Sequence, residues 1–311
     1  MIENGIRSVR IATRESQLAL WQARFVATEI RRVAPELHVE LAPMSTMGDR
    51  NRVDALQTMG GQGVFTREVQ RAVLDKQADL AVHSLKDLPT IPTPGLTLAG
   101  VPARAPRFDA LILPENQTGD FASLPPGARI GTGSPRRQSQ LLRHRPDLQL
   151  MEIRGNVETR LSKLDAGEYE AIILAEAGLR RLSLQARISQ ILAPPLLYPA
   201  VGQAALGIEC REDDLELREI LARTTDPATN IEVRAERACL ATLQAGCHAP
   251  VGLLSTINGE TLTLEALVLS PDGKQCFRVL VKGAANTPES LGQEAANQLV
   301  QQGAAAVLSA C

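Results

Sequence analysis

The sequence predicts an α/β protein that ends in a smaller α+β domain. In the first two thirds, short apolar runs alternate with segments whose apolar residues recur at helical spacing. This alternation favours mostly parallel sheets with helices on their faces. In the last third, Asn258-Gly259 joins two apolar runs, which is typical of a hairpin with a type I′ turn. A length of 311 residues is enough for two or three domains.

The first α/β set opens with a strand at 9–13 and a helix at 18–33 that ends before Pro35. Its other predicted elements are a strand at 39–41, a helix at 65–74 with Thr66 as N-cap, and a strand at 80–82. Between them, residues 48–63 are polar and glycine-rich, and this stretch is long enough to be a mobile loop.

A second α/β set follows a proline-punctuated region, where a crossing between domains is expected. Its predicted elements are strands at 110–113, 129–131, 148–153 and 171–174, and helices that begin at Ser134-Pro135 and at 157. Ser134 can cap the free N–H groups of its helix, and Pro135 suits the first helical position. A later strand at 206–208 indicates that the chain returns to the first domain.

The last third has a different pattern. A helix is expected to open at Asp226-Pro227, with Thr229 and Glu232 as a capping box and Gly246 as its left-handed stop. Antiparallel strands are predicted at 251–257, 261–269 and 276–281, followed by a helix from Thr287-Pro288. This order predicts a small α+β domain with a three-stranded antiparallel sheet.

Composition excludes several classes of function. The net charge of −2 gives no drive toward nucleic acid or an anionic membrane, and 3% aromatic residues argue against base stacking. The five cysteines lack a CxxC pair, so neither a disulfide framework nor a metal site is indicated. The N-terminus has no apolar segment typical of a signal peptide, and the sequence has no long apolar run, so neither a signal peptide nor a membrane span is expected. A monomer in the reducing cytoplasm is the simplest expectation.

The strand at 80–82 leads directly into polar residues. Ser84, Lys86 and Asp87 follow it, and Pro89 ends it because proline has no N–H to donate. In α/β sheets, ligands bind at the carboxyl ends of the parallel strands. Asp87 is therefore a candidate acid or base. The alternative is an ordinary strand exit with solvated charges.

The arginines form the second informative pattern. Arg136 and Arg137 fall in the first turn of a helix, where positive charge opposes the helix dipole unless an anion binds there. Other arginines at strand ends or helix starts are Arg14, Arg154, Arg160 and Arg181. Each alone can be a solvated surface charge. Together they point to a cleft for a polyanion that carries carboxylates or phosphates. The chain has no Walker or GxGxxG motif, which disfavours a nucleotide.

Cys247 lies in a turn that glycine and proline bound, between a helix and a strand. A cysteine in such a turn can be an accessible nucleophile or attachment point, whereas most intracellular cysteines are small buried hydrophobes. The neighbouring His248 does not by itself make a Cys–His dyad.

These motifs, taken together, resemble the porphobilinogen deaminase family, also called hydroxymethylbilane synthases. The resemblance spans nearly the whole chain and rests on the shared order of several segments. They are 10–19 (RIATRESQLA), 81–87 (AVHSLKD), 131–138 (GTGSPRRQ), 154–161 (RGNVETRL), 175–182 (AEAGLRRL), 199–203 (PAVGQ), 207–211 (GIECR) and Gly246-Cys247.

The resemblance implies two α/β domains like type II periplasmic binding proteins and a third, small α+β domain. Their expected extents are 1–103 with 200–222, then 104–199, then 223–311. Cys247 would hold a dipyrromethane cofactor through a thioether. The implied enzyme is a transferase of tetrapyrrole and haem biosynthesis. It joins four porphobilinogen units head to tail, releases ammonia at each step and finally releases hydroxymethylbilane by hydrolysis.

The resemblance also implies roles for the candidate residues. Asp87 would be the acid/base that assists the loss of ammonia and stabilises the cationic azafulvene. The arginines would hold the acetate and propionate groups of the growing chain, since guanidinium pairs with carboxylate in a bidentate way. The expected cofactor-binding residues besides Cys247 are Ser84, Lys86, Asp87, Thr132, Ser134, Arg136 and Arg137. The expected substrate-binding residues are Arg14, Ser16, Arg154, Arg160, Arg181 and Gln203.

This chain departs from the usual family pattern at a few positions. Gln62 replaces a lysine, Gly133 a serine, and Ala204 and Ala245 glycines, and the segment 104–109 also differs. None of these changes removes Asp87, Cys247 or the main arginines, so activity is expected. Two alternatives remain open: a non-enzymatic binding protein for a small polyanion, and an acyl transferase that depends on the same cysteine.

Overall fold

The computed structural model describes residues 2–3, 6–45, 66–246 and 249–309. The expected loop at 48–63, which includes Gln62, and the pair Cys247 and His248 lie outside the described residues. The chain divides into two compact units. Unit 1 is Met1–Arg104 with Ala205–Asn230, and unit 2 is Ala105–Ala204 with Ile231–Cys311. The division into three domains stays a prediction.

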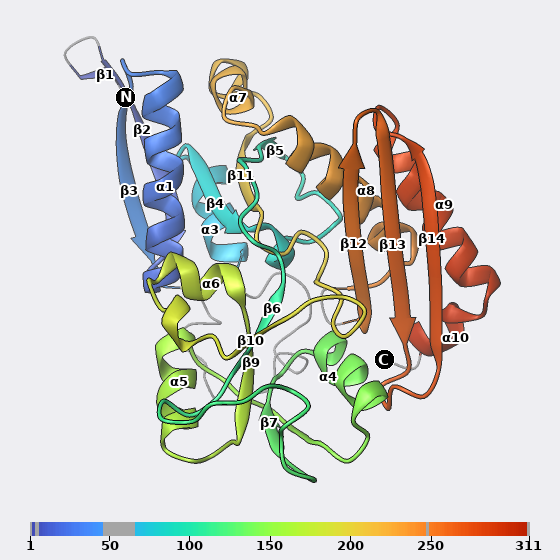
Figure 1. Ribbon diagram of the computed structural model, residues 1–311. Helices are drawn as coiled ribbons and strands as arrows, with labels where there is room; N and C mark the ends of the chain where they lie inside the picture. The colour runs from blue at the N-terminus through green and yellow to red at the C-terminus, as the bar shows by residue number, and fades with distance from the viewer. Residues whose placement is uncertain (1, 4–5, 46–65, 247–248, 310–311) are drawn as a thin grey trace. The chain divides into compact units, whose positions relative to one another are not determined.

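Unit 1 is built on a mixed sheet, drawn in blue, cyan and gold in Figure 1. Its described strands are β1 (Ile2–Glu3), β2 (Ile6–Arg14), β3 (His38–Met44), β4 (Leu80–Ser84), β5 (Leu96–Gly100) and β11 (Leu206–Arg211). Strands β3, β2 and β4 run parallel, and β11 lies between β4 and β5, antiparallel to both. The predicted return of the chain at 206–208 is therefore confirmed, and β2 and β4 end at the same edge of the sheet.

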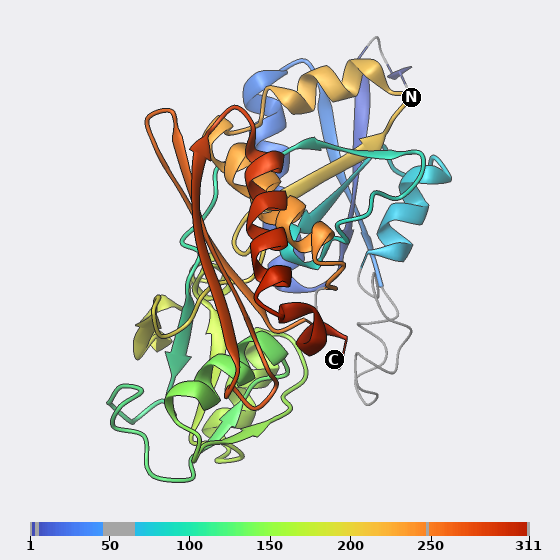
Figure 2. The same cartoon turned by 90° about the vertical axis from the view of Figure 1, so that its right-hand side faces the viewer.

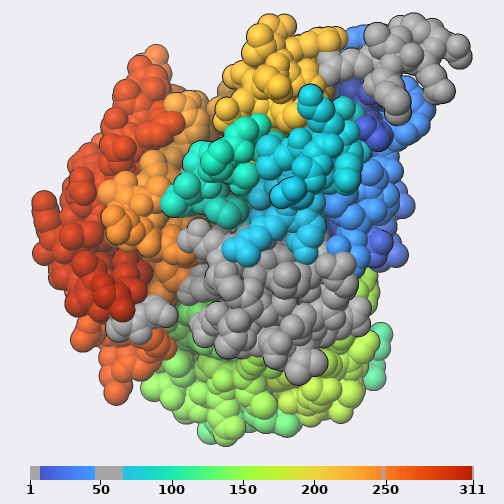
Figure 3. Space-filling view, turned by 180° about the vertical axis from the view of Figure 1, so that it is seen from behind, coloured from blue at the N-terminus to red at the C-terminus, as the bar shows by residue number. Residues whose placement is uncertain are grey.

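Helices cover both faces of this sheet. They are α1 (Gln17–Val33), α3 (Arg67–Leu74) and α7 (Leu215–Ala222). Side chains of α1 and α7 pack with Ile11, Leu80 and Ile208 on one face, and α3 packs with Ala81 on the other. The outer side of α3, cyan in Figure 3, faces solvent. Ser16 caps α1, since its Oγ accepts from the Ala19 N–H at 3.3 Å.

The sheet of unit 2 repeats the same plan. Its described strands are β6 (Asp109–Ile112), β7 (Arg129–Gly131), β8 (Gln149–Met151), β9 (Ala171–Ala175) and β10 (Gln190–Leu192). Strands β8, β7 and β9 are parallel, β6 is antiparallel to β9, and β10 is antiparallel to β6. The amino end of β6 therefore lies at the edge where β7, β8 and β9 end.

The helices of this region again divide between the two faces of the sheet. They are α4 (Pro135–His144), α5 (Val157–Asp165) and α6 (Glu176–Arg181). Leu141 of α4 packs with Ile130 on one face, whereas Leu164 of α5 and Leu179 of α6 pack with Ile172 on the other. The apolar runs of the strands are thus covered on both sides, as expected of α/β sheets.

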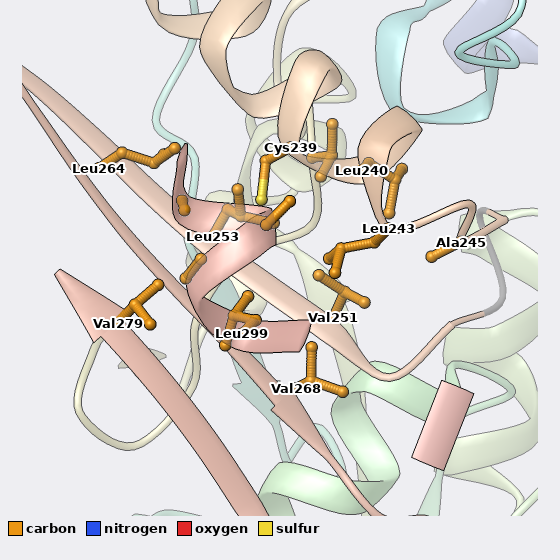
Figure 4. Packing of buried hydrophobic residues seen from close by; sticks show 14 of the residues in the cluster. Cys239, Leu240, Leu243, Ala245, Val251, Leu253, Leu264, Val268, Val279 and Leu299 are labelled. Atoms are coloured by element: carbon orange, nitrogen blue, oxygen red, sulfur yellow. The ribbon is translucent and has the colours of Figure 1, made fainter. Parts of the chain in front are cut away.

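The predicted three-stranded antiparallel sheet is present, so the fold class is confirmed. Its strands are β12 (Val251–Asn258), β13 (Thr261–Leu269) and β14 (Cys276–Ala284). The helices of this part are α8 (Pro227–Thr242), α9 (Pro288–Gln301) and α10 (Ala304–Leu308). Helices α8 and α9 cover one face of the sheet (Figure 2), where Cys239, Leu253, Leu264 and Leu299 belong to one buried cluster (Figure 4).

The hairpin turn differs from the expected type. Asn258 pairs with Thr261, so Gly259 and Glu260 form the two-residue loop. Of these two residues only Gly259 has a positive φ, +60°. A positive φ at the first loop position alone is the pattern of a type II′ turn, whereas type I′ needs it at both positions.

Both ends of α8 also differ from the prediction. The capping residue is Asp226, whose Oδ1 accepts from the Thr229 N–H at 2.7 Å. The expected box does not form, because the Thr229 hydroxyl accepts from the Arg104 N–H at 3.0 Å and Glu232 pairs with Arg107 at 3.1 Å.

The residue that ends α8 in the left-handed conformation is Gln244, with φ of +51°, and not Gly246. The Ala245 N–H then donates to the Leu240 carbonyl at 3.2 Å, which closes the helix end as in a Schellman motif.

Two other caps are weaker than expected. Thr66 and Ser134 occupy the cap positions of α3 and α4, but neither makes a side-chain cap hydrogen bond. Pro135 does take the first position of α4. Across the described ranges, none of the helices has the length and apolar character of a membrane span.

Candidate active site

Strand β4 delivers Asp87 to the carboxyl edge of the unit 1 sheet. The chain leaves the strand at Ser84 and forms one short 3₁₀ turn, Leu85–Asp87, in which Lys86 and Asp87 are half-buried. The Asp87 carboxylate makes no hydrogen bond or ion pair with the described part of the chain. Arg14 ends the parallel strand β2, whose Ile11 is in register with Leu80. The predicted acid and the first predicted arginine therefore share one edge.

Ser84 is held by a residue that the sequence analysis missed. Gln22 of α1 is 3% exposed, and its Nε2 lies 2.9 Å from the Ser84 Oγ while its Oε1 accepts from the same hydroxyl at 3.3 Å. A signal was present in the sequence, because Gln22 falls within the buried stripe of α1 between Ala19 and Val26. A polar residue in such a stripe needs a buried partner.

The unit 2 edge is organised around Asp109, at the amino end of β6. Asp109 is fully buried, and its Oδ1 accepts from Arg137 Nη2 at 2.7 Å and Nε at 3.2 Å. Arg136 Nη1 lies 2.8 Å from Oδ2, which is an ion-pair distance without hydrogen-bond alignment. Burial alone would raise the pKa of Asp109, but the charges of Arg136 and Arg137 hold this pKa well below its usual range. The carboxylate is therefore ionised and neutralises part of the arginine charge.

Arg136 and Arg137 are both buried, at 4% and 6% exposure, and are braced by the backbone. Arg137 Nη1 donates to the Ile173 carbonyl at 2.8 Å, and Arg136 Nη1 to the Tyr198 carbonyl at 2.5 Å. Burial lowers the pKa of Arg136, although Asp109 opposes that change. The Arg136 Nε is buried and has no hydrogen-bond partner among the described residues.

Tyr198 connects this edge to the three-stranded sheet. The Gln140 amide of α4 accepts from the Tyr198 N–H at 2.7 Å and donates to the Tyr198 carbonyl at 3.2 Å. The Tyr198 hydroxyl donates to Glu265 of β13 at 2.8 Å, and Arg278 of β14 pairs with the same carboxylate. Tyr198 thus links helix α4 to strand β13.

Three other predicted residues lie around the start of α4. Thr132 is fully buried, and its Oγ1 accepts from the Ser134 N–H at 3.3 Å. Gln203 is also fully buried, and its Nε2 donates to the Arg107 carbonyl at 2.8 Å and to Asp109 Oδ1 at 3.1 Å. Gln203 thus joins the cluster that Asp109 forms with the two arginines.

The remaining predicted arginines of unit 2 follow β8 and β9. Arg154 Nε lies 2.8 Å from Glu152 Oε1, and Arg160 Nε donates to the Gly155 carbonyl at 2.9 Å. Arg181 Nη2 donates to the Ala204 carbonyl at 2.7 Å, and burial lowers the pKa of Arg181 to about 10.

The predicted residues therefore form two groups, one in each unit. Unit 1 holds Arg14, Ser16, Ser84, Lys86 and Asp87, and unit 2 holds Thr132, Ser134, Arg136, Arg137, Arg154, Arg160, Arg181 and Gln203. The sequence analysis missed the carboxylates that pair with the arginines, Asp109 and Glu152. Within the described residues, no cluster of three or more histidine, cysteine or acidic side chains could hold a metal ion.

Solved structures with a distantly similar fold include a periplasmic domain, a putative binding protein and an effector binding domain. The periplasmic VFT2 domain of BvgS from Bordetella pertussis is 13% identical over 70% of this chain and 86% of its own, with a TM-score of 0.43. The putative periplasmic sulfonate-binding protein SsuA from Methylobacillus flagellatus is 15% identical over 77% and 68%, with a TM-score of 0.40. The BenM effector binding domain with benzoate is 15% identical over 70% and 90%, with a TM-score of 0.42.

Family models match most of the chain. The model described as "Porphobilinogen deaminase, dipyromethane cofactor binding domain" matches residues 9–219, and the one described as "Porphobilinogen deaminase, C-terminal domain" matches residues 230–301. The family resemblance found in the sequence is therefore confirmed. The cofactor is dipyrromethane, and the family's substrate is porphobilinogen. This chain belongs to the porphobilinogen deaminase family.

Proposed function

We propose that this protein is a hydroxymethylbilane synthase. It joins four porphobilinogen units head to tail, releases one ammonia for each unit, and frees the product by hydrolysis. The strongest support is the set of side chains at the two strand edges, in a chain that belongs to the porphobilinogen deaminase family. One edge carries an acid, Asp87, that has no partner in the described part of the chain, and the other carries several arginines.

The residues present fit a dipyrromethane cofactor with its carboxylates. Arg136 and Arg137 bring two positive charges against the one negative charge of Asp109, so the buried cluster is cationic by one charge. The buried Arg136 Nε also still lacks an acceptor among the described residues. A buried donor of this kind is costly unless it is paired, so an added carboxylate would stabilise the cluster. The cofactor supplies the free pyrrole α-carbon to which the first unit is joined, and Cys247 is its proposed attachment point.

The partly exposed arginines at the two strand edges are proposed to hold substrate. Porphobilinogen carries an acetate and a propionate, and each added unit brings two more carboxylates. Arg14, Arg154, Arg160 and Arg181 are the proposed partners of these groups, because a guanidinium can donate two parallel hydrogen bonds to one carboxylate. Ser16 and Gln203 are the proposed supporting residues for substrate, and Ser84, Lys86, Thr132 and Ser134 are those for the cofactor.

Asp87 is the proposed acid/base. The amine of porphobilinogen leaves in its protonated form: the C–N bond breaks, ammonia takes the electron pair, and a cationic azafulvene remains. The Asp87 carboxylate stabilises this cation, as a fixed charge placed against developing charge does. After the new C–C bond forms, the pyrrole α-carbon loses a proton, and Asp87 accepts it as a general base.

We also propose that the protein acts as a monomer in the cytoplasm, without nucleic acid or membrane as partner. The odd number of cysteines supports a reducing compartment, as does the free state of Cys210, Cys239 and Cys276. Burial raises the pKa of the Cys210 and Cys239 thiols to about 11 and about 12. Both thiols are therefore unsuited to attach a cofactor, and Cys247 is favoured by its place in the Gly246-Cys247 motif that this chain shares with the family.

The direct test is the intact mass of the purified protein. The expected mass exceeds that of the polypeptide by a dipyrromethane adduct, and the protein gives a pyrrole-dependent colour reaction. Cys247→Ser is expected to lose both signals, while Cys276→Ser, a matched control, keeps both. Porphobilinogen consumption and ammonia release are measured on the same samples.

A folded protein of unmodified mass that neither assembles the adduct nor consumes porphobilinogen would contradict the proposal. If that protein still bound small polycarboxylates, it would be a binding protein. Turnover of an ester without any pyrrole adduct would instead indicate an acyl transferase.

A further inference from the structure

Glu152 places a carboxylate of the chain itself at the substrate arginines of unit 2. It follows β8, two residues before Arg154, and Ile153 between them is 2% exposed. Glu152 is exposed and Arg154 is partly exposed, so the two charged side chains on either side of Ile153 both leave the core. The Arg154 Nε lies 2.8 Å from Glu152 Oε1. The two side chains are 18% and 51% exposed, so the pair lies at the surface of the edge.

Two neighbouring residues, Tyr169 and Gly133, constrain the position of Glu152. The hydroxyl of Tyr169, which is 6% exposed, donates to the Glu152 carbonyl at 2.9 Å. On the other side, Gly133 leaves the space that the carboxylate fills. A Cβ built on Gly133 would lie 2.8 Å from both Glu152 oxygens, closer than a Cβ carbon approaches other atoms. The position of the carboxylate therefore depends on glycine at residue 133.

This placement puts a carboxylate beside the start of α4 and on the guanidinium of Arg154. It has the same chemistry as the acetate and propionate groups that Arg154 is proposed to hold. A half-exposed ion pair is worth about 1 kcal/mol or less, so a ligand carboxylate can displace it. The buried Asp109 cannot be displaced in this way, because it has no access to solvent.

We propose that Glu152 is a specificity-determining residue that competes with substrate carboxylates for Arg154. This inference rests on the proposed function. Glu152 lowers the affinity of the site for any single carboxylate, so ligands that bring several carboxylates are favoured over small monocarboxylates. Gly133 is the residue that allows this competition.

The test compares Glu152→Gln with the wild type and with Glu158→Gln. Glu158 is an exposed residue in the first turn of α5, and Arg154 pairs with Glu152 instead, so the control makes the same change in net charge outside the pair. Two readouts are used: the KM for porphobilinogen, and the Kd of an analogue that lacks the aminomethyl leaving group. In Glu152→Gln both constants are expected to fall about two- to fivefold, as the loss of a half-exposed competing pair predicts. Glu158→Gln is expected to leave both unchanged.

Two further variants separate competition from a general charge effect. Gly133→Ala adds only a Cβ, which keeps the charge of Glu152 but displaces its carboxylate, so the Kd of the analogue is expected to fall as in Glu152→Gln. In an Arg154→Gln background, Glu152→Gln is expected to have no further effect, because the guanidinium for which Glu152 and the ligand compete is already absent. The four proteins form a double-mutant cycle. Thermal unfolding checks that each variant is folded.

Unchanged constants in Glu152→Gln, or the same change in Glu158→Gln, would overturn the inference. Failure of the proposed function has a different signature, because the wild type would then not consume porphobilinogen at all. The Kd of the non-reactive analogue would still decide whether Glu152 competes for Arg154.

Discussion

The edge of unit 1 that carries Asp87 and the edge of unit 2 that carries Arg136 and Arg137 share one architecture but differ in how their charges are paired. Both lie where three parallel strands end beside an antiparallel neighbour. The Asp87 carboxylate is half-buried and has no partner in the described ranges. Asp109 is fully buried and has two arginines as partners. Two aspartates in similar places therefore differ in burial and pairing, and we propose different tasks for them.

The difference teaches how a carboxylate can serve either chemistry or structure. A reactive acid must exchange protons, so it has to stay accessible and free of strong partners. A buried carboxylate must be paired, because an isolated buried charge is strongly destabilising. Asp109 also orients the two arginines before any ligand arrives, which reduces the ordering cost of binding. The contrast predicts that mutations at the two aspartates have opposite effects on turnover and stability.

The largest expected effect on turnover is that of Asp87→Asn. The amide cannot accept the proton or stabilise the cation, so kcat is expected to fall about 100- to 10,000-fold, as for a general acid/base. The urea midpoint of unfolding should stay within error of the wild type, because no described contact is lost. Asp87→Glu keeps a carboxylate and should retain more activity than the asparagine variant. Near-normal ammonia release from Asp87→Asn would remove Asp87 from the chemistry.

Asp109→Asn should show the opposite pattern, with its main effect on stability. It leaves Arg136 and Arg137 as buried, uncompensated charges, so the free energy of unfolding should fall by about 3–5 kcal/mol. Urea denaturation measures this loss. Asp213→Asn is a matched control, since this aspartate is 80% exposed and should change stability by less than about 0.5 kcal/mol. Equal stability of the two variants would mean that the pairing of Asp109 with Arg136 and Arg137 does not stabilise the fold.

The pH dependence of stability sharpens the same contrast. The folded pKa of Asp109 is depressed, so the stability from its ion pairs is present above the unfolded pKa of about 3.9. It is lost as the pH falls through the folded pKa. The stability difference between wild type and Asp109→Asn should therefore be constant between about pH 5 and 8 and shrink below about pH 4. Urea titrations at several pH values test this, and a difference that shrinks already near pH 6 would contradict it.

The smallest expected effect is that of Ala204→Gly, at the residue whose carbonyl accepts from Arg181. Ala204 has φ of +71°, a left-handed conformation that costs a residue with a Cβ about 1–2 kcal/mol. Glycine removes this strain but adds chain entropy, so the net gain in stability should be about 0.5–1 kcal/mol. Ala200→Gly, at a residue without positive φ, should instead lose about 0.5–1 kcal/mol. Thermal or urea unfolding of both variants decides whether the Ala204 backbone is strained.

Much of the fold could be predicted from the sequence because its cores consist of local apolar runs. The strands near 80–82, 129–131 and 171–174 and the three-stranded sheet have such runs with clear turn signals beside them. The helices and strands that were missed are short: β1, β5, β10, α6, α7 and α10. For example, Leu96–Gly100 closely follows several prolines, and only its pairing with β11 makes it a strand.

The site could be predicted only in part, for a physical reason. Arginines at strand ends are visible in a sequence, but their partners are not, since Asp109 is 27 residues before Arg136 and Glu152 resembles any surface glutamate. Nothing in the sequence separates a buried aspartate at a strand start from a solvated one. Gln22 is the exception, because a polar residue inside an apolar helical stripe signals a buried partner.

The position of β11 has a consequence for synthesis of the chain. This strand fills the gap between β4 and β5, but it is made more than one hundred residues after both. Until the ribosome has passed residue 211, β4 and β5 each keep an open edge, and such edges invite wrong pairing. At about 5–20 residues per second this interval lasts several seconds. The risk of wrong strand pairing is therefore greatest during translation, before β11 has paired with β4 and β5.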